Sequence, residues 1–276
     1  MIFISKENLS HNYRQIDKFS GNSTVISVIK GDGYGHGLLE CCKILKSSNC
    51  KNFYVARLDD AIKLREKFKN INIYLLSGVI SKNDLKDIKN SKIIPIINNI
   101  DQLSLLNTSQ KLNYILHVDT GMNRLGFHTS ELEKYSNLIN KRNIIFLMSH
   151  LSSADDLNKN ESNRQLEKLI EVNKKFNLPL SIANSSGIYL GKKFHLNYVR
   201  PGKSLYGINP FYKKNFNLKQ VMSIYTPILQ IQNVNKGSSI GYSQTYKLKK
   251  NLKVATIDFG YSDGFLRSGS NKGFVF

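Results

Sequence analysis

Cysteine, acidic residues and long apolar runs are scarce in this sequence, and each scarcity narrows what the protein can be. The three cysteines at positions 41, 42 and 50 have no zinc-site spacing and no matched framework, so we expect reduced thiols and no metal site. No apolar run approaches membrane-spanning length, and the first residues, MIFISKENLS, become polar too early for a signal peptide. A cytoplasmic protein with no membrane partner is the simplest interpretation. No internal repeat or low-complexity linker is evident.

Acidic residues number 20 against 40 lysines and arginines, which gives a formal charge of +20. Such an excess is typical of proteins that bind nucleic acids or anionic membranes. Here most lysines are scattered along the chain, with only short clusters such as 247–253. We therefore expect salt-sensitive adhesion to polyanions at most, and no nucleic acid as a specific partner.

The chain is long enough, at 276 residues, for one α/β barrel or for two domains. Short apolar runs typical of buried strands alternate with stretches of helical periodicity; in 159–176, for example, Leu166, Leu169 and Ile170 share a face. This α/β alternation implies parallel strands with right-handed crossovers, and eight such units close into a (β/α)8 barrel of the TIM type. The eight strands are expected at 24–30, 52–56, 72–77, 92–97, 113–119, 144–149, 179–183 and 204–208.

From about residue 219 the pattern changes to strands separated by turn signals, with no convincing helix. We therefore predict a barrel over 1–218 and the N-terminal part of a β-rich C-terminal domain over 219–276. Residues 1–8 are expected to include a strand that pairs with the second domain. The last residues, 273–276, have the pattern of a further strand, so the β-rich domain is expected to be incomplete.

The segment TVISVIKGDGYGHG, residues 24–37, combines a buried strand with a glycine-rich turn. Lys30 ends the strand, and the glycines that follow let the backbone turn sharply and approach a bound group. A lysine at the mouth of a buried strand is partly desolvated, which lowers the pKa of its amine and frees it for Schiff-base chemistry. A lone lysine in this position would more often only extend towards solvent. The glycine-rich turn and the nearby Tyr34 favour a functional role.

Other distinctive polar residues also fall at strand ends, where barrels of this type build their active sites. They are Arg124 after the fifth strand, His150 at the end of the sixth, Asn184 and Ser185 at the end of the seventh, and Arg200 and Gly202 where the last begins. Each has an ordinary structural explanation, such as a surface ion pair, a core histidine or a helix N-cap. Their common placement favours a single site.

Ser185 and the backbone amides near Gly202 are expected to cradle an anion after the seventh and eighth strands, the usual phosphate position in such barrels. A reactive lysine together with a phosphate cradle indicates pyridoxal 5'-phosphate as the cofactor. That cofactor attaches to a lysine and acts as an electron sink.

Seven segments of the chain resemble, in the same order, those of the bacterial alanine racemases, a family of fold-type III pyridoxal phosphate enzymes. They are VIKGDGYGHG, HVDTGMNRLGF, MSHLSSAD, ANSSGI, VRPGKSLYG, GYSQTY and IDFGYSDGFLR. The resemblance extends from the first residues to the last. It implies a barrel followed by a β domain, and an isomerase that interconverts L- and D-alanine and supplies D-alanine for peptidoglycan and the cell wall. It also implies a homodimer in which each active site receives a tyrosine from the other subunit.

The resemblance assigns roles to individual residues. Lys30 resembles the Schiff-base lysine and one of two acid/base groups, and Tyr242 resembles the opposing base, contributed across the dimer interface. Tyr261 resembles the tyrosine that narrows the substrate entrance. The other implied cofactor-binding residues are Tyr34, Ser185 and Gly202 at the phosphate, Asn184 at the same strand end, Arg200 at the pyridine nitrogen, His150 against the ring, and Arg124 at the phenolic oxygen and the substrate carboxylate.

Racemisation requires two bases on opposite sides of a planar intermediate, because the α-proton leaves from one face and returns on the other. A tyrosine with a pKa of about 10 needs nearby cations to act as a base at neutral pH, and a network of Arg200 and His150 could provide them. An arginine at the pyridine nitrogen cannot give up its proton, so the ring is expected to stay unprotonated, which limits side reactions such as transamination.

Two departures from the family stand out. In much of the family a lysine, often carbamylated, holds the active-site arginine; His117 stands in its place, so we expect a chloride or a neutral imidazole to hold Arg124. Family members also continue beyond this terminus, so we expect a fragment or truncated product with an impaired dimeric site. The alternative functions are a broad-specificity amino-acid racemase of the same fold and a non-catalytic pyridoxal phosphate-binding barrel.

Overall fold

The computed structural model describes residues 1–108, 112–156, 158–211 and 214–273. The chain forms two compact units, one of residues 4–222 and one that combines residues 1–3 with 223–276. Within the described ranges, no helix has the length and apolar character needed to cross a bilayer. The same ranges contain no group of three or more histidine, cysteine, aspartate or glutamate side chains that could hold a metal ion.

The first unit is built on a parallel sheet with the strand order β2-β10-β9-β8-β7-β6-β5-β4-β3. The strands are β2 (Thr24–Val25), β3 (Ser27–Val28), β4 (Asn52–Val55), β5 (Asn72–Leu75), β6 (Ile94–Ile97), β7 (Tyr114–His117), β8 (Ile144–Met148), β9 (Leu180–Asn184) and β10 (Tyr198–Arg200). The end strands β2 and β3 are consecutive pieces of one segment, which pairs with β10 on one side and β4 on the other. The sheet therefore closes on itself, and the predicted TIM-type barrel is confirmed.

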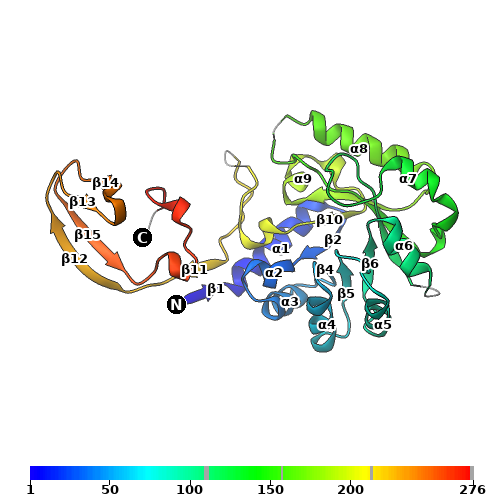
Figure 1. Ribbon diagram of the computed structural model, residues 1–276, viewed down its shortest axis with the longest axis horizontal. Helices are drawn as coiled ribbons and strands as arrows, with labels where there is room; N and C mark the ends of the chain where they lie inside the picture. The colour runs from blue at the N-terminus through cyan, green and yellow to red at the C-terminus, as the bar shows by residue number, and fades with distance from the viewer. Residues whose placement is uncertain (109–111, 157, 212–213, 274–276) are drawn as a thin grey trace. The chain divides into compact units, whose positions relative to one another are not determined.

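Helices alternate with these strands along the chain and cover the barrel (Figure 1). They are α1 (Lys6–Ser20), α2 (Lys30–Tyr34), α3 (Leu38–Ser47), α4 (Leu58–Lys67), α5 (Lys82–Asn90), α6 (Ile100–Asn107), α7 (Thr129–Lys134), α8 (Asn160–Asn173) and α9 (Ser185–Leu190). Polar caps set where several of them begin. Ser81, for example, accepts from the Asp84 N–H, and the Asp84 carboxylate accepts from the Ser81 N–H, which forms a capping box for α5.

The predicted eighth strand at 204–208 is wrong. Most of that stretch is a 3-10 helix, η4 (Lys203–Tyr206), and the eighth barrel strand is β10, a few residues earlier. Gly207 ends η4 with a φ of +88°, and a Cβ there would lie 2.2 Å from the Lys219 carbonyl oxygen. The chain therefore turns sharply where a strand would have to continue.

Two apolar clusters form the core of the barrel unit. The larger lies between the strands and the surrounding helices, and the smaller fills the barrel interior. The interior cluster consists of Ile26, Val28, Tyr54, Tyr74, Ile96, Ile115, Phe146 and Met148. Several of these residues are two positions apart, as expected where every second side chain of a strand points inward.

The second unit is β-rich, as predicted. Its strands are β11 (Met222–Ile224), β12 (Ile228–Val234), β13 (Ser239–Ile240), β14 (Tyr246–Lys247) and β15 (Leu252–Ile257). β12 pairs antiparallel with β15, and β13 with β14. The first strand of the chain, β1 (Ile2–Ile4), pairs with β11. The strand expected at 273–276 lies, beyond Gly273, outside the described residues.

Candidate active site

At the carboxyl ends of five strands, the inward-facing side chains change from apolar to polar. Because side chains alternate between the two faces of a strand, each inward apolar residue predicts another inward residue two positions later. Five such positions are polar: Lys30 after Val28, Asn98 after Ile96, His117 after Ile115, His150 after Met148 and Arg200 after Tyr198. Hydrogen bonds join neighbours in this ring, since His117 Nδ1 lies 2.8 Å from Asn98 Oδ1 and Arg200 Nη2 lies 3.3 Å from His150 Nδ1.

Lys30 directly follows the barrel segment 24–29 and begins a short left-handed turn. Residues 31–34 all have positive φ, at 61°, 53°, 63° and 55°. This backbone is unfavourable for the non-glycine residues Asp32 and Tyr34, and such strain gathers at functional sites. The Lys30 amine is half-buried; burial first, and then the charge of Arg124, lower its pKa. A lowered pKa leaves more of the amine neutral, and Schiff-base chemistry requires a neutral amine.

Ser185 and Gly202 meet at the carboxyl ends of β9 and β10. Ser185 Oγ accepts from the Gly202 N–H at 2.9 Å and from the Ser204 N–H at 3.2 Å. Within the described part of the chain, the buried Ser204 Oγ has no hydrogen-bond partner. A Cβ on Gly202 would lie 2.4 Å from Tyr34 Oη, so glycine is what admits the tyrosine hydroxyl to this backbone. These amide and hydroxyl donors have the chemistry of a phosphate site.

Asn184 ends β9, and its side chain serves the helix that follows. Its Oδ1 accepts from the Gly187 N–H at 2.9 Å, which makes Asn184 the N-cap of α9. The structure therefore shows the ordinary structural role of Asn184, that of a helix N-cap. A direct contact between Asn184 and a cofactor stays a prediction.

Arg200 lies inside the barrel with 3% of its surface exposed. It donates to the Ser181 hydroxyl and to the Ser149 carbonyl, and it approaches His150 Nδ1. Burial lowers the pKa of Arg200 to about 10, so the guanidinium keeps its charge at neutral pH. Burial, followed by the charges of Arg200 and Arg124, lowers the pKa of His150 well below its usual value. The His150 imidazole is thus neutral and can accept from Arg200.

His117 is buried at the end of β7 and is also neutral. Burial first, and then the charge of Arg200, lower its pKa to about 3. The Asn98 amide donates to two backbone carbonyls, so its Oδ1 faces His117 and His117 Nδ1 carries the proton. Arg124 is exposed in the loop before α7, and no side-chain hydrogen bond or ion pair of Arg124 is present among the described residues. A chloride or imidazole that holds Arg124 stays a prediction.

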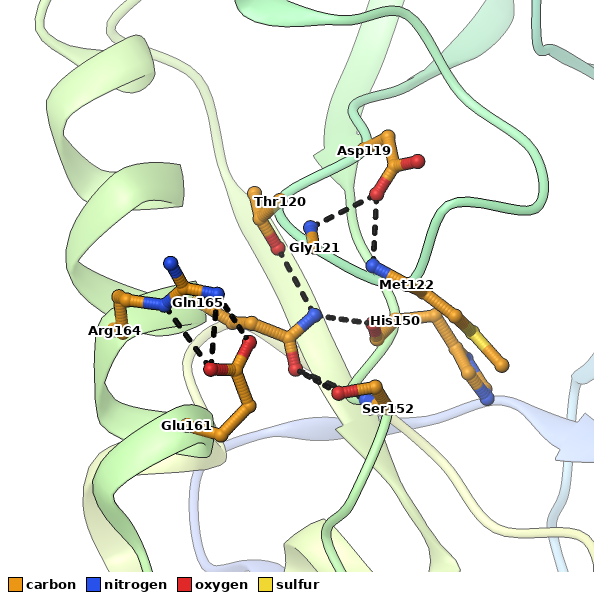
Figure 2. Close-up of polar contacts among 9 residues, drawn as sticks. All are labelled: Asp119, Thr120, Gly121, Met122, His150, Ser152, Glu161, Arg164 and Gln165. Atoms are coloured by element: carbon orange, nitrogen blue, oxygen red, sulfur yellow. Dashed lines mark hydrogen bonds and ion pairs between the residues drawn. The ribbon is translucent and has the colours of Figure 1, made fainter.

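Positive charge dominates this mouth of the barrel. Lys30, Arg124 and Arg200 supply it, while the carboxylate of Asp119 is engaged by its own loop. Asp119 Oδ1 accepts from the backbone N–H groups of Gly121 and Met122, each at 2.9 Å (Figure 2). The site therefore suits an anionic ligand.

Tyr242 and Tyr261 belong to the β-rich unit. Tyr242 begins the 3-10 helix η5 (Tyr242–Gln244) and is 84% exposed; Tyr261 begins η6 (Tyr261–Asp263) and is 67% exposed. Two largely exposed phenols are available to contact other groups. Their contribution to the site of Lys30 stays a prediction.

Sequence reasoning missed three polar residues around the site: Asn98, Ser204 and Gln165. Asn98 carried a signal, because it stands two positions after an inward apolar residue, as His117 does. Gln165 carried a weaker signal, because it stands four positions before Leu169 and therefore shares a helix face with it. Ser204 carried no such signal in the sequence, since it lay inside an expected strand.

Family models match the chain in two consecutive parts. The alanine racemase N-terminal domain matches residues 4–210, and the alanine racemase C-terminal domain matches residues 221–276. Among curated relatives, the alanine racemase of Rickettsia bellii is 37% identical over 269 residues. That match covers 94% of this chain and 65% of the relative, so the chain spans slightly less than two thirds of that protein's length.

Solved structures agree with these matches. The alanine racemase from Bartonella henselae, with covalently bound pyridoxal phosphate, has a TM-score of 0.87 and 30% identity, with 99% of this chain and 79% of that chain covered. The biosynthetic alanine racemase from Pseudomonas aeruginosa has a TM-score of 0.90 and 26% identity, with 98% and 77% covered. Since the two domain models account for nearly the whole chain, in the order in which the barrel and the β-rich part follow one another, the chain belongs to the alanine racemase family.

Proposed function

We propose that this protein interconverts L-alanine and D-alanine with pyridoxal phosphate as its cofactor. The observation that carries the proposal is Lys30, a half-buried lysine with a lowered pKa at the mouth of a cation-rich barrel. Such an amine is neutral more often than a surface lysine, and it can both bond to a carbonyl carbon and exchange a proton. The sequence motif and the family both support this assignment.

The residues present fit pyridoxal phosphate. Ser185, Gly202 and Tyr34 would hold the phosphate, since Gly202 leaves the space of a Cβ to the Tyr34 hydroxyl and the nearby Ser204 Oγ is buried without a partner in the described part of the chain. Lys30 would hold the aldehyde carbon. When bound, the cofactor supplies an electron sink that acidifies the α-proton of the amino acid.

Lys30 and Tyr242 are the proposed pair of bases. The Lys30 amine would take or return the α-proton on one face of the substrate, and the Tyr242 phenol would serve the other face. An 84% exposed tyrosine is available to a second copy of the chain. We therefore include a homodimer, with Tyr242 shared across its interface, in the proposal.

Arg200 and His150 are proposed to set the electrostatics. Arg200 keeps its proton, so it would donate a hydrogen bond to the ring nitrogen without protonating it. The neutral His150 accepts from Arg200, which leaves the imidazole face free to lie against a planar ring. Arg124 would attract the substrate carboxylate, and Tyr261 would narrow the entrance.

The proposed place of this reaction is the cytoplasm, where it would supply D-alanine for peptidoglycan. The support for the compartment is that the three cysteines, at positions 41, 42 and 50, are buried and free of disulfides.

Absorption spectroscopy and turnover together test the proposal. The purified chain is mixed with pyridoxal phosphate, with Lys30→Ala as the control, and then with D- and L-alanine, with serine and lysine as competing substrates. We expect a band of lysine-bound cofactor that Lys30→Ala lacks, and racemisation of alanine above the other two. No band in the parent chain would contradict the cofactor assignment, and a band without alanine turnover would contradict the activity. Comparable rates on all three would favour a broad-specificity racemase.

A further inference from the structure

Gln165 lies on the second turn of α8 with none of its surface exposed. A buried carboxamide is costly unless its polar atoms are paired, and Gln165 uses all of its hydrogen-bonding capacity. Its Oε1 accepts from the Ser152 N–H at 2.9 Å and from the Ser152 hydroxyl at 3.1 Å. Its Nε2 donates to the His150 carbonyl at 3.0 Å and, at 3.5 Å, to Thr120 Oγ1.

The chemistry of these partners fixes the orientation of the amide. The Ser152 N–H can only donate and the His150 carbonyl can only accept, so Oε1 must face the first and Nε2 the second. One side chain therefore joins the loop after β7, which contains Thr120, to the loop after β8 (Figure 2). Thr120 Oγ1 also lies 2.7 Å from Ser149 Oγ, which ties the two loops a second time.

The segment 149–152 is held from two sides. From the barrel interior, Arg200 binds the Ser149 carbonyl and His150 Nδ1. From the helix layer, Gln165 binds the backbone of His150 and Ser152. Because the His150 ring is attached to this backbone, its direction relative to Arg200 depends on both attachments.

We propose that Gln165 is a positioning residue that fixes the His150 imidazole against Arg200 by bonding the backbone of the loop after β8. The proposal rests on the function proposed above, in which His150 lies against the cofactor ring. Gln165 itself touches neither substrate nor cofactor in this assignment.

Gln102, on α6, provides a matched control. Its Nε2 donates to the Ser77 carbonyl at 2.7 Å and its Oε1 accepts from the Asn98 N–H at 2.9 Å, so it anchors the loops after β5 and β6 in the same way. Replacement of Gln165 by methionine leaves two backbone groups of the loop after β8 without their side-chain partner, and replacement of Gln102 leaves one backbone group in each of the loops after β5 and β6. If Gln165 only stabilised the fold, Gln165→Met and Gln102→Met would therefore change the His150 resonances to the same extent.

The first test needs no cofactor or activity. In apoprotein of the 276-residue chain with ¹⁵N-labelled histidine, we expect Gln165→Met to shift the His150 imidazole resonances and to speed amide exchange in 149–152, while Gln102→Met leaves both unchanged. Both variants are expected to lower the melting temperature.

Ser152→Ala provides a second variant in case Gln165→Met does not fold. It removes only the hydrogen bond from the Ser152 hydroxyl, so the His150 resonances should shift in the same direction by a smaller amount. Unmoved His150 resonances in Gln165→Met or Ser152→Ala, or equal shifts in Gln102→Met, would overturn the proposal.

The second test uses the cofactor-loaded enzyme. We expect Gln165→Met to lower kcat about tenfold and to shift the cofactor absorption maximum, with the KM for alanine nearly unchanged, because a misplaced group costs rate more than ground-state binding. Gln102→Met, which removes a partner of Asn98 and not of His150, should keep the absorption maximum. An unchanged kcat in a variant whose His150 resonances have moved would contradict the positioning role of Gln165. A parent chain with no turnover would count against the proposed function alone, since the apoprotein test still decides whether Gln165 orients His150.

Discussion

His117 shows how a single buried side chain makes stability depend on pH. The residue is 4% exposed, its ring is hydrogen-bonded to Asn98, and burial lowers its pKa from 6.5 to about 3. Between these two values the unfolded chain binds a proton at this histidine and the folded chain does not. Stability therefore rises with pH across this window and is lost as the pH falls from 6.5 towards 3.

We predict that His117→Gln flattens this acid dependence, because glutamine keeps a donor for Asn98 and binds no proton. The slope of unfolding free energy against pH should fall by up to about 1.4 kcal/mol per pH unit within the window. Urea unfolding of the apoprotein at several pH values measures it. His128→Gln, an exposed position, is the control, and identical slopes in the parent and His117→Gln would contradict the low pKa.

The turn at 31–34 places a functional side chain by means of a strained backbone. Four consecutive left-handed residues include two that are not glycine, Asp32 and Tyr34, and each of these costs about 1–2 kcal/mol. Local bonds offset the strain: Asp32 Oδ1 accepts from the Leu38 N–H at 2.8 Å, and the Asp32 carbonyl accepts from the Gly37 N–H at 2.9 Å. The turn thus brings Tyr34 back towards Gly202 soon after Lys30.

Alanine substitutions separate backbone strain from crowding in this turn. A Cβ on Gly31 meets nothing within 4 Å, whereas a Cβ on Gly33 would lie 3.0 Å from Cys41 Sγ, and both glycines have φ near +60°. We expect Gly31→Ala to cost about 1 kcal/mol and Gly33→Ala about 1–3 kcal/mol more. Chemical unfolding measures both. Cys41→Ala should recover much of the difference when combined with Gly33→Ala, and equal losses in the two single variants would argue against the crowding.

Most barrel strands could be predicted because a strand covered on both faces needs a continuous apolar run. The eighth could not, since β10 has only three residues and the apolar stretch after it is turned by Gly207. Helix α8 shows a second limit: Ile170, expected on the buried face, is 44% exposed, while the polar Gln165 is buried. Hydrophobic periodicity cannot reveal a glutamine whose place is set by backbone groups of distant loops.

At the scale of the whole molecule, the barrel gathers the candidate cofactor residues, while the proposed second base, Tyr242, belongs to the β-rich unit. In sequence, Lys30 lies near the start of the barrel unit and Ser185, Arg200 and Gly202 lie near its end, and closure of the sheet brings these strand ends to one rim. Their types and strand-end positions could be predicted from the sequence. Contacts that depend on the path of the loops, such as Gly202 with Tyr34, could not, because spacing along the chain does not report them.

A shared active site makes a prediction that no single-subunit site makes. In a mixture of Lys30→Ala and Tyr242→Phe subunits, each inactive alone, a hybrid dimer would have one site with both residues intact and one with neither. Equal mixing after unfolding and refolding should therefore restore about a quarter of the parent racemase activity. The readout is alanine racemisation, with each variant refolded alone as the control. If the mixture stayed as inactive as its components while the refolded parent recovered its rate, Lys30 and Tyr242 would have to act within one subunit.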